Sequence, residues 1–317
     1  MFSWLLLIVI RHALILTAGL GTRLRPLTDV RAKAAMPVAG EPIVRRIIRW
    51  LVSHGVTDLV LNLHHRPETI TAVVGDGGDL GARVRYSWEQ PVVLGSAGGP
   101  RLAIPLVGAD PFFIVNGDTL TNVDLDGLAG AHARSGALVT LALVPNHAFD
   151  RYGGVVLDAD ARVRGFVARG PAAKGSYHYI GVQLAHADAF AAIRPGDVAR
   201  SIGGIYDTLM TSRPGSIRSF VSAAEFWDVG TVVDYWRTTR AFVDRSPGDV
   251  QGSARIDPTA SVTRSILWDA VEVGARAVID ECIVTDRVRI PPDARHRQEI
   301  IRRGGDDGDV IVSPFVP

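Results

Sequence analysis

The chain has 317 residues, which is enough for one large domain or two domains of ordinary size. Hydrophobic residues make up 47% and charged residues 21%, as in soluble globular proteins, and the net charge of +1 gives no electrostatic reason to expect a nucleic-acid or membrane-surface partner. The single cysteine, Cys282, excludes an intramolecular disulfide and a cysteine-rich zinc site. It suits a reducing compartment, so we expect a cytoplasmic protein.

The opening MFSWLLLIVI has the apolar character of a signal peptide but lacks a basic n-region. Its apolar run ends at Arg11, short of the ~20 residues needed to span a bilayer. Cleavage near Thr17 would also destroy the glycine-rich segment that follows. We therefore interpret residues 1–11 as an N-terminal extension, with a membrane anchor as the alternative.

The first half of the chain alternates between short apolar runs and helical periods. We predict strands at residues 13–18, 58–63, 82–88 and 111–118, helices at 42–54 and 67–74, and a turn-rich segment at 89–100. Strands that alternate with helices pair in parallel, with helices on both faces of the sheet. Ligands then bind beyond the carboxyl ends of the strands, so the glycine-rich segment and Asn116-Gly117-Asp118 should lie at the same edge.

From about Ala137 the pattern is richer in strands. We predict strands in "ALVTLALVP", "YGGVVLD", "RVRGFVA" and "YHYIGVQLA", and then a helix near residues 231–244. After residue 249, apolar residues recur at a spacing close to six, which indicates a few coils of a parallel β-helix; an ordinary β-rich tail is the alternative. We predict a main domain at 12–246 and a β-helix-like tail at 247–317.

The segment "LTAGLGTRLRPLTDVRAKAAMPVAG", residues 16–40, places glycines and basic residues directly after a strand. Glycines let a backbone approach a ligand closely, and Arg23 and Lys33 suggest that the ligand is anionic. A Walker loop would end in Gly-Lys-Ser/Thr, which is missing here. A dinucleotide fingerprint would need a third glycine at the place of Leu24. The segment therefore indicates another kind of phosphate loop.

This segment resembles the signature of the sugar-1-phosphate nucleotidyltransferases, Ala-Gly-x-Gly-Thr-Arg-Leu-Arg-Pro-Leu-Thr followed by Pro-Lys-Pro and Pro-Val. Arg23 and Lys33 stand at the family's two basic positions, whereas Ala32 and Ala34 replace the two prolines, which should loosen the loop. "LGSAGGP", "VNGD", "YIGVQL", "FWDVGT" and the tail extend the resemblance over almost the whole chain after residue 12. It implies an α/β fold: a Rossmann-like domain with a mixed sheet, followed by a short left-handed parallel β-helix.

The family joins a nucleoside triphosphate to a sugar 1-phosphate and releases pyrophosphate. The nucleophile is already an anionic oxygen, so the protein must align two polyanions and stabilise the departing charge. Carboxylates should carry Mg²⁺, because the two phosphates would otherwise repel each other. Asp118 ends the strand "FFIVNGD", and the resemblance implies Asp228 as the second metal ligand. The competing interpretations are an Asx turn or cap for Asp118 and, for Asp228, a cap on the helix from Thr231.

The resemblance also assigns the other site residues. It implies Arg23 and Lys33 as catalytic residues, and Ala18, Gly19, Gly21, Thr22, Glu89, Gly95, Ser96 and Gly98 for the nucleotide. Asn116, Arg169 and Gly181 are implied for the sugar phosphate. In "GFVARGP", Arg169 replaces the family's lysine and Ala168 its glutamate, which leaves the sugar open. The base should bind along "EQPVVLGSAGGP", residues 89–100, for which a plain surface turn is the alternative.

The combination of motifs looks most like mannose-1-phosphate guanylyltransferases, which make GDP-mannose from GTP and mannose 1-phosphate. Glucose-1-phosphate thymidylyl or uridylyl transfer is the alternative, and a non-catalytic nucleotide-sugar-binding subunit is an alternative of another class. A glycosyltransferase would need an Asp-x-Asp metal motif, but Asp124-Leu125-Asp126 should instead cap a helix. We expect the tail to form homo-oligomer contacts or a regulatory site without supplying catalytic groups, so a chain cut near Pro247 should keep some turnover if it stays folded.

Overall fold

The computed structural model describes residues 10–243, 253–304 and 309–316. The chain forms two compact units. The sheet unit comprises Met1–Gly19, Ile47–Pro67 and Val74–Trp227, and the β-helix unit comprises Leu20–Arg46, Glu68–Val73 and Asp228–Pro317. The glycine-rich segment from Leu20 onward thus groups with the tail. The expected boundary at residues 246 and 247, and residues 1–9 of the expected extension, lie outside the described residues.

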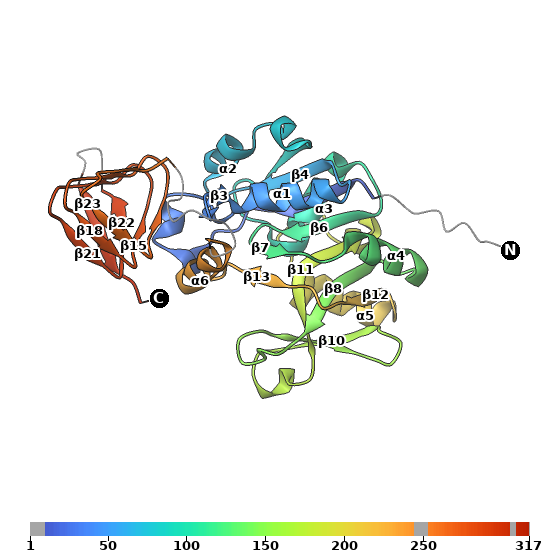
Figure 1. Cartoon of the computed structure of the whole chain (residues 1–317). Helices are drawn as coiled ribbons and strands as arrows, with labels where there is room; N and C mark the ends of the chain where they lie inside the picture. The colour runs from blue at the N-terminus through green and yellow to red at the C-terminus, as the bar shows by residue number, and fades with distance from the viewer. Residues whose placement is uncertain (1–9, 244–252, 305–308, 317) are drawn as a thin grey trace. The chain divides into compact units, whose positions relative to one another are not determined.

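The sheet unit is built on a nine-stranded mixed sheet (Figure 1). Seven strands follow the order β10-β9-β11-β6-β1-β4-β5, and β8 joins β11 to β12. The strands β6, β1, β4 and β5 are parallel, whereas β11 runs antiparallel to β6, β8 and β9. The strands are β1 (His12–Leu16), β4 (Asp58–Leu63), β5 (Arg83–Trp88), β6 (Phe112–Asn116), β8 (Val139–Pro145), β9 (Gly154–Leu157), β10 (Val163–Val167), β11 (Tyr177–Ala185) and β12 (Ile217–Val221). The predicted mixed α/β sheet is confirmed.

Helices pack on this sheet through apolar faces. The helices among the described residues are α1 (Ile43–Ser53), α2 (Pro67–Val74), α3 (Gly95–Val107), α4 (Leu125–Ser135) and α5 (Tyr206–Ser212), together with α6 (Val232–Val243) of the β-helix unit. In α1 the predicted stripe of Ile43, Ile47 and Leu51 is fully buried or nearly so. The Asp124 side chain accepts a hydrogen bond from the Asp126 N–H at 3.1 Å, so the Asp-x-Asp sequence caps α4 as predicted.

Short elements complete the described chain. These are the pairs β2 (Pro37–Val38) with β3 (Glu41–Pro42) and β7 (Thr119–Thr121) with β13 (Phe226–Asp228), and 3-10 turns at Thr22–Leu24, Leu27–Asp29, Lys33–Ala35, Gly78–Leu80, Pro171–Ala173 and Ala187–Phe190, with a kinked turn at Ser201–Ile205. Three of the 3-10 turns fall within residues 20–46. The glycine-rich segment is therefore a series of tight turns.

The prediction of turns at residues 89–100 is wrong for its second half, where α3 begins at Gly95. Glycine and proline in "LGSAGGP" favour turns in an isolated peptide, and α3 even contains Pro100 and Pro105. Tertiary contacts outweigh this preference. The N–H groups of Ala97 and Gly98 donate to the Ala199 carbonyl at 3.0 and 3.3 Å, and Ala97 is buried.

The tail consists of stacked short strands in three parallel sheets, β14-β17-β20, β15-β18-β21 and β16-β19-β22. The strands are β14 (Arg255–Ile256), β15 (Ser261–Thr263), β16 (Ile266–Leu267), β17 (Glu272–Val273), β18 (Val278–Asp280), β19 (Ile283–Val284), β20 (Arg289–Ile290), β21 (Arg295–Arg297), β22 (Glu299–Arg303) and the antiparallel β23 (Val310–Pro314). Three strands per coil explain the apolar spacing near six. The prediction of a parallel β-helix is confirmed.

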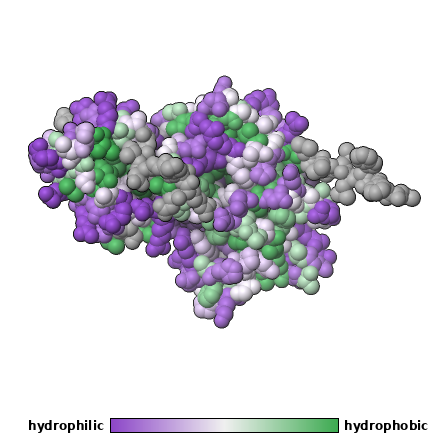
Figure 2. Space-filling view, viewed as in Figure 1, coloured by the Kyte–Doolittle hydropathy of each residue, from purple (hydrophilic) through white to green (hydrophobic). Residues whose placement is uncertain are grey.

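The interior of the β-helix is apolar, and Val271, Ala277, Ile279, Cys282 and Val284 are fully buried in it. Figure 2 shows mostly hydrophilic residues along the outer edge of the coils. Over all described residues, no helix combines the length and apolarity needed to cross a membrane.

Candidate active site

The glycine-rich segment starts at the carboxyl edge of the sheet. The Asn62 Oδ1 atom, at the end of β4, accepts hydrogen bonds from the N–H groups of Thr17 at 2.6 Å and Ala18 at 3.3 Å. The Gly117 N–H, directly after β6, donates to the Leu16 carbonyl at 2.9 Å. The start of the segment and the Asn-Gly-Asp turn therefore lie at one edge, as predicted. Asn62 was not predicted as a residue that holds this segment. An asparagine within the apolar run "DLVLNL" was the signal that could have identified it.

Gly19 and Gly21 of this segment have different surroundings. Gly21 has a φ of 60°, and a Cβ there would lie 2.7 Å from Thr28 Cγ2 and 3.5 Å from Lys33 Cβ. The Thr28 hydroxyl donates to the Gly21 carbonyl at 3.0 Å and closes this turn. A Cβ on Gly19 would meet no described atom within 4 Å. The fold explains Gly21 and places Lys33 beside it, whereas Gly19 borders open space.

Opposite charges converge near Gly230 in the β-helix unit. A Cβ on Gly230 would lie 3.1 Å from Asp228 Oδ2, 3.2 Å from Asp234 Oδ2 and 3.7 Å from Arg23 Nη1. The structure thus brings Arg23 and Asp228 together. The Thr231 hydroxyl accepts a hydrogen bond from the Asp234 N–H at 3.2 Å and so caps the N-terminus of α6. A cap on this helix was the alternative role for Asp228, and Thr231 fills it instead. Asp234 was not predicted; its signal was an acid in the first turn of α6.

Glu89 is fully buried and fixes two segments of the sheet unit. Its Oε1 accepts the Asn62 side-chain amide at 2.7 Å, and its Oε2 accepts the Leu94 N–H at 2.6 Å. Because Asn62 also holds Thr17 and Ala18, Glu89 connects the start of the glycine-rich segment to the segment before α3. This geometry supports a positioning role for Glu89.

The motif "LGSAGG" forms the first turn of α3, so the alternative of a plain surface turn is wrong. A Cβ on Gly95 would lie 2.7 Å from the Ala199 carbonyl oxygen, and one on Gly98 would overlap the Asp197 carbonyl oxygen. The Ser96 hydroxyl accepts the Ser201 N–H at 2.9 Å. These glycines are therefore explained by close packing of α3 on residues 197–199 within the protein.

The residues predicted for the sugar side fall in two places. Gly181, in β11, has a φ of 78°, and a Cβ there would lie 2.8 Å from Asn116 Nδ2 at the end of the neighbouring β6. Arg169 is exposed and follows β10, the outermost strand of the seven-strand order. Its backbone N lies 3.9 Å from a Cβ built on Gly153. The structure brings Asn116 and Gly181 together and places Arg169 beside the "YGG" turn.

Comparisons with known proteins identify the family of this chain. A family model described as "Nucleotidyl transferase" matches residues 12–245. The chain belongs to this nucleotidyl transferase family. A second model, described as "GlmU-like, C-terminal hexapeptide", matches residues 246–298. The resemblance inferred from the motifs is confirmed over both parts of the chain.

Relatives in the nucleotidyl transferase family carry different substrate names. The chain is 28% identical to the UTP–glucose-1-phosphate uridylyltransferase of Synechocystis, over 82% of this chain and 71% of the relative. It is 27% identical to the mannose-1-phosphate guanylyltransferase of Mycobacterium tuberculosis, over 88% of this chain and 80% of the relative. The solved structure of HddC from Yersinia pseudotuberculosis matches with a TM-score of 0.63 at 22% identity, over 73% of this chain and 98% of that one, and supports the fold.

Tyr179 is a further polar residue beside this nucleotidyl transferase's Asn-Gly-Asp turn. Burial, together with Tyr206 and the charge of Asp118, raises the pKa of the Tyr179 phenol well above its ordinary value. The phenol therefore keeps its proton at neutral pH and can donate a hydrogen bond. Sequence reasoning missed Tyr179, whose only signal was its place two residues before Gly181.

Asp118 and Asp228 are the two carboxylates that the sequence predicts as magnesium ligands. Among the described residues, no group of three or more His, Cys, Asp or Glu side chains could hold a metal ion. Mg²⁺ does not need such a cage, because it commonly binds one or two carboxylates together with phosphate oxygens and water. Asp118 lies in the turn between β6 and β7, Asp228 ends β13, and both are half-buried.

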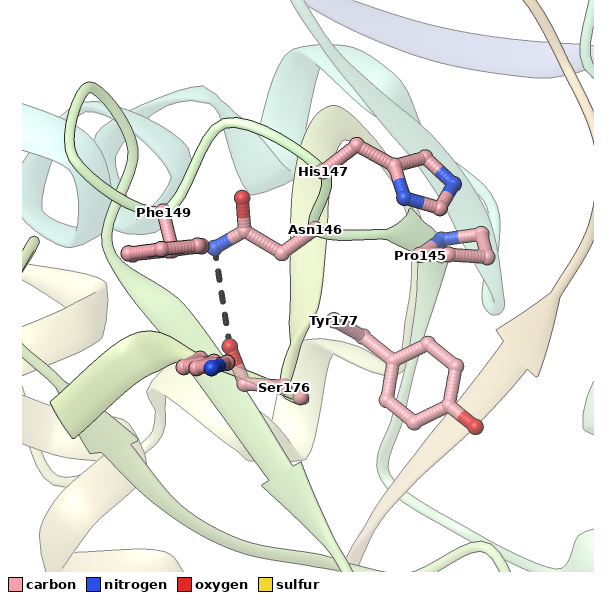
Figure 3. Close-up of a pocket in the computed structure, with 8 residues that line it drawn as sticks. Pro145, Asn146, His147, Phe149, Ser176 and Tyr177 are labelled. Atoms are coloured by element: carbon pink, nitrogen blue, oxygen red, sulfur yellow. Dashed lines mark hydrogen bonds between the residues drawn. The ribbon is translucent and has the colours of Figure 1, made fainter. Parts of the chain in front are cut away.

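A separate cavity of about 330 Å³ opens where β8 ends and β11 begins (Figure 3). Its lining includes Asn146, whose side-chain nitrogen lies 3.5 Å from the Ser176 hydroxyl, together with His147, Lys174 and Tyr177. None of the residues predicted for the nucleotidyl transferase site lines it.

Proposed function

We propose that this nucleotidyl transferase transfers guanylyl from GTP to mannose 1-phosphate, giving GDP-mannose and pyrophosphate. The surroundings of the glycine-rich segment are the observation that supports the proposed phosphate chemistry. Lys33 lies beside Gly21, the exposed Arg23 lies beside Asp228, and Gly19 borders open space. Cationic groups next to a backbone that a ligand can approach closely are what a polyphosphate requires.

Arg23 and Lys33 stabilise the negative charge that gathers on the departing pyrophosphate. The backbone from Ala18 to Thr22 approaches the triphosphate, with Gly19 leaving room for it. Asp118 and Asp228 are proposed as magnesium ligands that act together with phosphate oxygens. When bound, Mg²⁺ supplies the positive charge that lets two phosphates approach each other.

The base is proposed to bind along the segment Leu94–Gly98. Asn62 and Glu89 hold this segment and the start of the phosphate loop in one arrangement through their hydrogen bonds. A site whose backbone groups are fixed before binding loses less entropy when the nucleotide arrives. Glu89 thus contributes to nucleotide binding by positioning.

The sugar phosphate is proposed to contact Asn116, Gly181 and Arg169, with Tyr179 as an additional hydrogen-bond donor. The name of the Mycobacterium tuberculosis relative favours GTP and mannose 1-phosphate. The name of the Synechocystis relative favours UTP and glucose 1-phosphate as the second candidate, and thymidylyl transfer belongs to the same alternative. Retention of Arg23, Lys33, Asp118 and Asp228 favours an enzyme over a regulatory subunit that only binds nucleotide sugars. Association of subunits through the hexapeptide tail is part of the proposal.

A substrate panel tests this function. Purified protein is incubated with each of five nucleoside triphosphates and several sugar 1-phosphates, with Mg²⁺ or with excess chelator, and pyrophosphate release is measured. We expect release only when all three components are present, fastest with GTP and mannose 1-phosphate. Full activity in excess chelator would contradict the metal requirement. Binding of nucleotide sugars without any turnover would instead support the regulatory subunit.

A further inference from the structure

Arg31 is a buried cation two residues before Lys33, and only 9% of it is exposed. Its Nε and Nη2 atoms donate to the two carboxylate oxygens of Asp286, both at 2.6 Å, and Nη2 also donates to Asp269 at 2.7 Å. A fork of this kind fixes the orientation of a guanidinium as well as its position. Both aspartates belong to the tail, so the β-helix holds the backbone directly before Lys33.

A second set of contacts holds the backbone after Lys33. The Tyr235 hydroxyl of α6 donates to the Pro37 carbonyl at 2.6 Å. The Trp268 indole N–H of the β-helix donates to the same hydroxyl at 2.9 Å, and the Arg31 guanidinium lies 5.4 Å from the Trp268 ring centroid. Tyr235 and Trp268 are fully buried. We call Arg31, Tyr235, Trp268, Asp269 and Asp286 the loop brace.

The segment between the two attachment points includes Lys33. The turn Lys33–Ala35 lies between Arg31 and Pro37, and Arg31 Nη1 also lies 3.5 Å from the Ala35 carbonyl oxygen. Ala32 and Ala34 flank the lysine, and alanine does not restrict the backbone as proline does. The local sequence therefore adds little stiffness here. The Ala32 N–H donates to the Thr69 hydroxyl at 3.0 Å, and the loop brace holds the backbone on both sides of Lys33.

We propose that the β-helix is a positioning element for catalysis: Asp269 and Asp286 through Arg31, and Trp268 through Tyr235, hold Lys33 in place for the phosphate ligand. The proposal rests on the proposed function, since Lys33 acts there on the triphosphate. None of these five residues is assigned to contact substrate. Their effect is to limit the positions that the Lys33 backbone can take.

The test compares two sets of asparagine variants. The double variant Asp269→Asn, Asp286→Asn keeps side-chain size but removes the charges that hold Arg31. Asp293→Asn is the matched control, because Asp293 accepts two hydrogen bonds of 2.7 Å from Arg276 elsewhere in the same β-helix. We expect faster amide hydrogen exchange in residues 31–38 of the double variant, and a fall in kcat of about 10–100-fold, since small misplacements of a reacting geometry have effects of this size. The control should match the wild type in both.

Two further variants keep the test decisive if the double variant does not fold. Trp268→Phe keeps an aromatic ring, although a smaller one, and removes the N–H donor, whereas Arg31→Lys keeps the charge but removes the fork. Both should show faster exchange in residues 31–38 and a lower kcat at saturating substrates. Exchange and kcat equal to those of Asp293→Asn in every folded variant would overturn the loop brace. A wild type that releases no pyrophosphate would overturn the proposed function, and the exchange rates would still decide the brace.

Discussion

At the scale of single residues, the site combines groups that the fold explains with groups that it does not. The conformation of Gly21 follows from its turn and from Thr28, whereas a side chain on Gly19 would meet no described atom within 4 Å. Arg23 is exposed, although keeping its guanidinium close to Asp228 restricts a flexible side chain. We therefore propose that a bound ligand explains the open space beside Gly19 and the position of the Arg23 guanidinium.

Arg23→Ala is expected to lower kcat by ~10²–10³-fold, the typical effect of removing one donor that stabilises developing charge. The contact strengthens as the pyrophosphate leaves, so the loss should appear in kcat more than in KM. Steady-state pyrophosphate release measures it, with folding checked by circular dichroism. Arg25→Ala is the matched control, because Arg25 is exposed and lies 3.4 Å from Asp29. A near-normal kcat for Arg23→Ala would refute the phosphate-loop interpretation.

Arg169→Ala is expected to raise the KM for the sugar phosphate by about tenfold or more, the worth of a hydrogen bond to a charged group. The charge of that phosphate changes little during the reaction, so kcat should be nearly unchanged. Arg164→Ala removes a comparable exposed arginine from β10 and serves as the control. An unchanged KM would show that "GFVARGP" does not contact the sugar phosphate.

His132 makes the stability of the protein depend on pH. Burial, with a contribution from the neighbouring His186, lowers its pKa to about 4, and its Nδ1 lies 2.8 Å from the Thr140 hydroxyl. An unfolded histidine has a pKa of about 6.5, so the unfolded state binds more protons between these values and stability falls as the pH drops from 6.5 to 4. The loss should reach about 2 kcal/mol at pH 5.

Urea unfolding of the wild type and of His132→Gln at pH 7 and pH 5 measures this effect. The variant should lose less stability between the two pH values. Burial also lowers the pKa of His178, which is present in both proteins and therefore contributes equally to both losses. Equal losses in the two proteins would show that His132 is not responsible.

At the scale of elements, α3 shows how packing decides a local structure that composition disfavours. Its first five residues include three glycines, and Gly95 and Gly98 lie against the backbone of residues 197–199. Side chains at these two positions would push α3 away from that backbone. The start of α3 is therefore fixed by its packing against residues 197–199.

Gly98→Ala is expected to destabilise the protein by about 1–3 kcal/mol, the usual cost of overpacking, because its Cβ would overlap the Asp197 carbonyl oxygen. Gly130→Ala in α4 is the control. Its Cβ would first meet the mobile end of Arg134, at 3.2 Å, so the gain in helix propensity of up to about 1 kcal/mol should dominate. Urea unfolding of both variants measures the difference. Equal stability of the two variants would contradict the packing argument.

At the scale of the whole molecule, the tail and residues 20–46 of the glycine-rich segment belong to one compact unit. Trp236 of α6 also packs against Phe315, with ring centroids 5.2 Å apart. These contacts add to the Arg31 and Tyr235 contacts of the loop brace. The tail therefore has a structural relation to the loop that is separate from any role in subunit association.

A chain without residues 253–317 is expected to be less stable and to turn over at least about tenfold more slowly, because Arg31 would keep its charge without its partners. The motifs alone suggested that a cut near Pro247, outside the described residues, leaves some turnover. The contacts of Arg31 make a large loss the expected result. Thermal unfolding and pyrophosphate release of the shortened chain measure both effects. A folded product with wild-type kcat would show that the tail does not position the loop.

Much of the fold was predictable because its signals are local. The apolar stripe of α1, the alternation of strands and helices and the tail's recurring apolar positions each reflect the period of one element. The 3-10 turns and α3 were not predictable in the same way. Their conformations depend on partners such as Thr28 for Gly21 and Ala199 for Ala97.

The sequence by itself determined the family and the charged groups, because short motifs identify them. It also determined the main helices and strands, because each has its own apolar periodicity. Only the tertiary structure decided that Glu89 is buried and accepts hydrogen bonds from Asn62 and Leu94, and that Asp234 lies near Arg23. It also decided that Arg31 is held by Asp269 and Asp286, which are 238 and 255 positions away. No local pattern predicts such pairs, because a side chain's partner is chosen by the packing of distant segments.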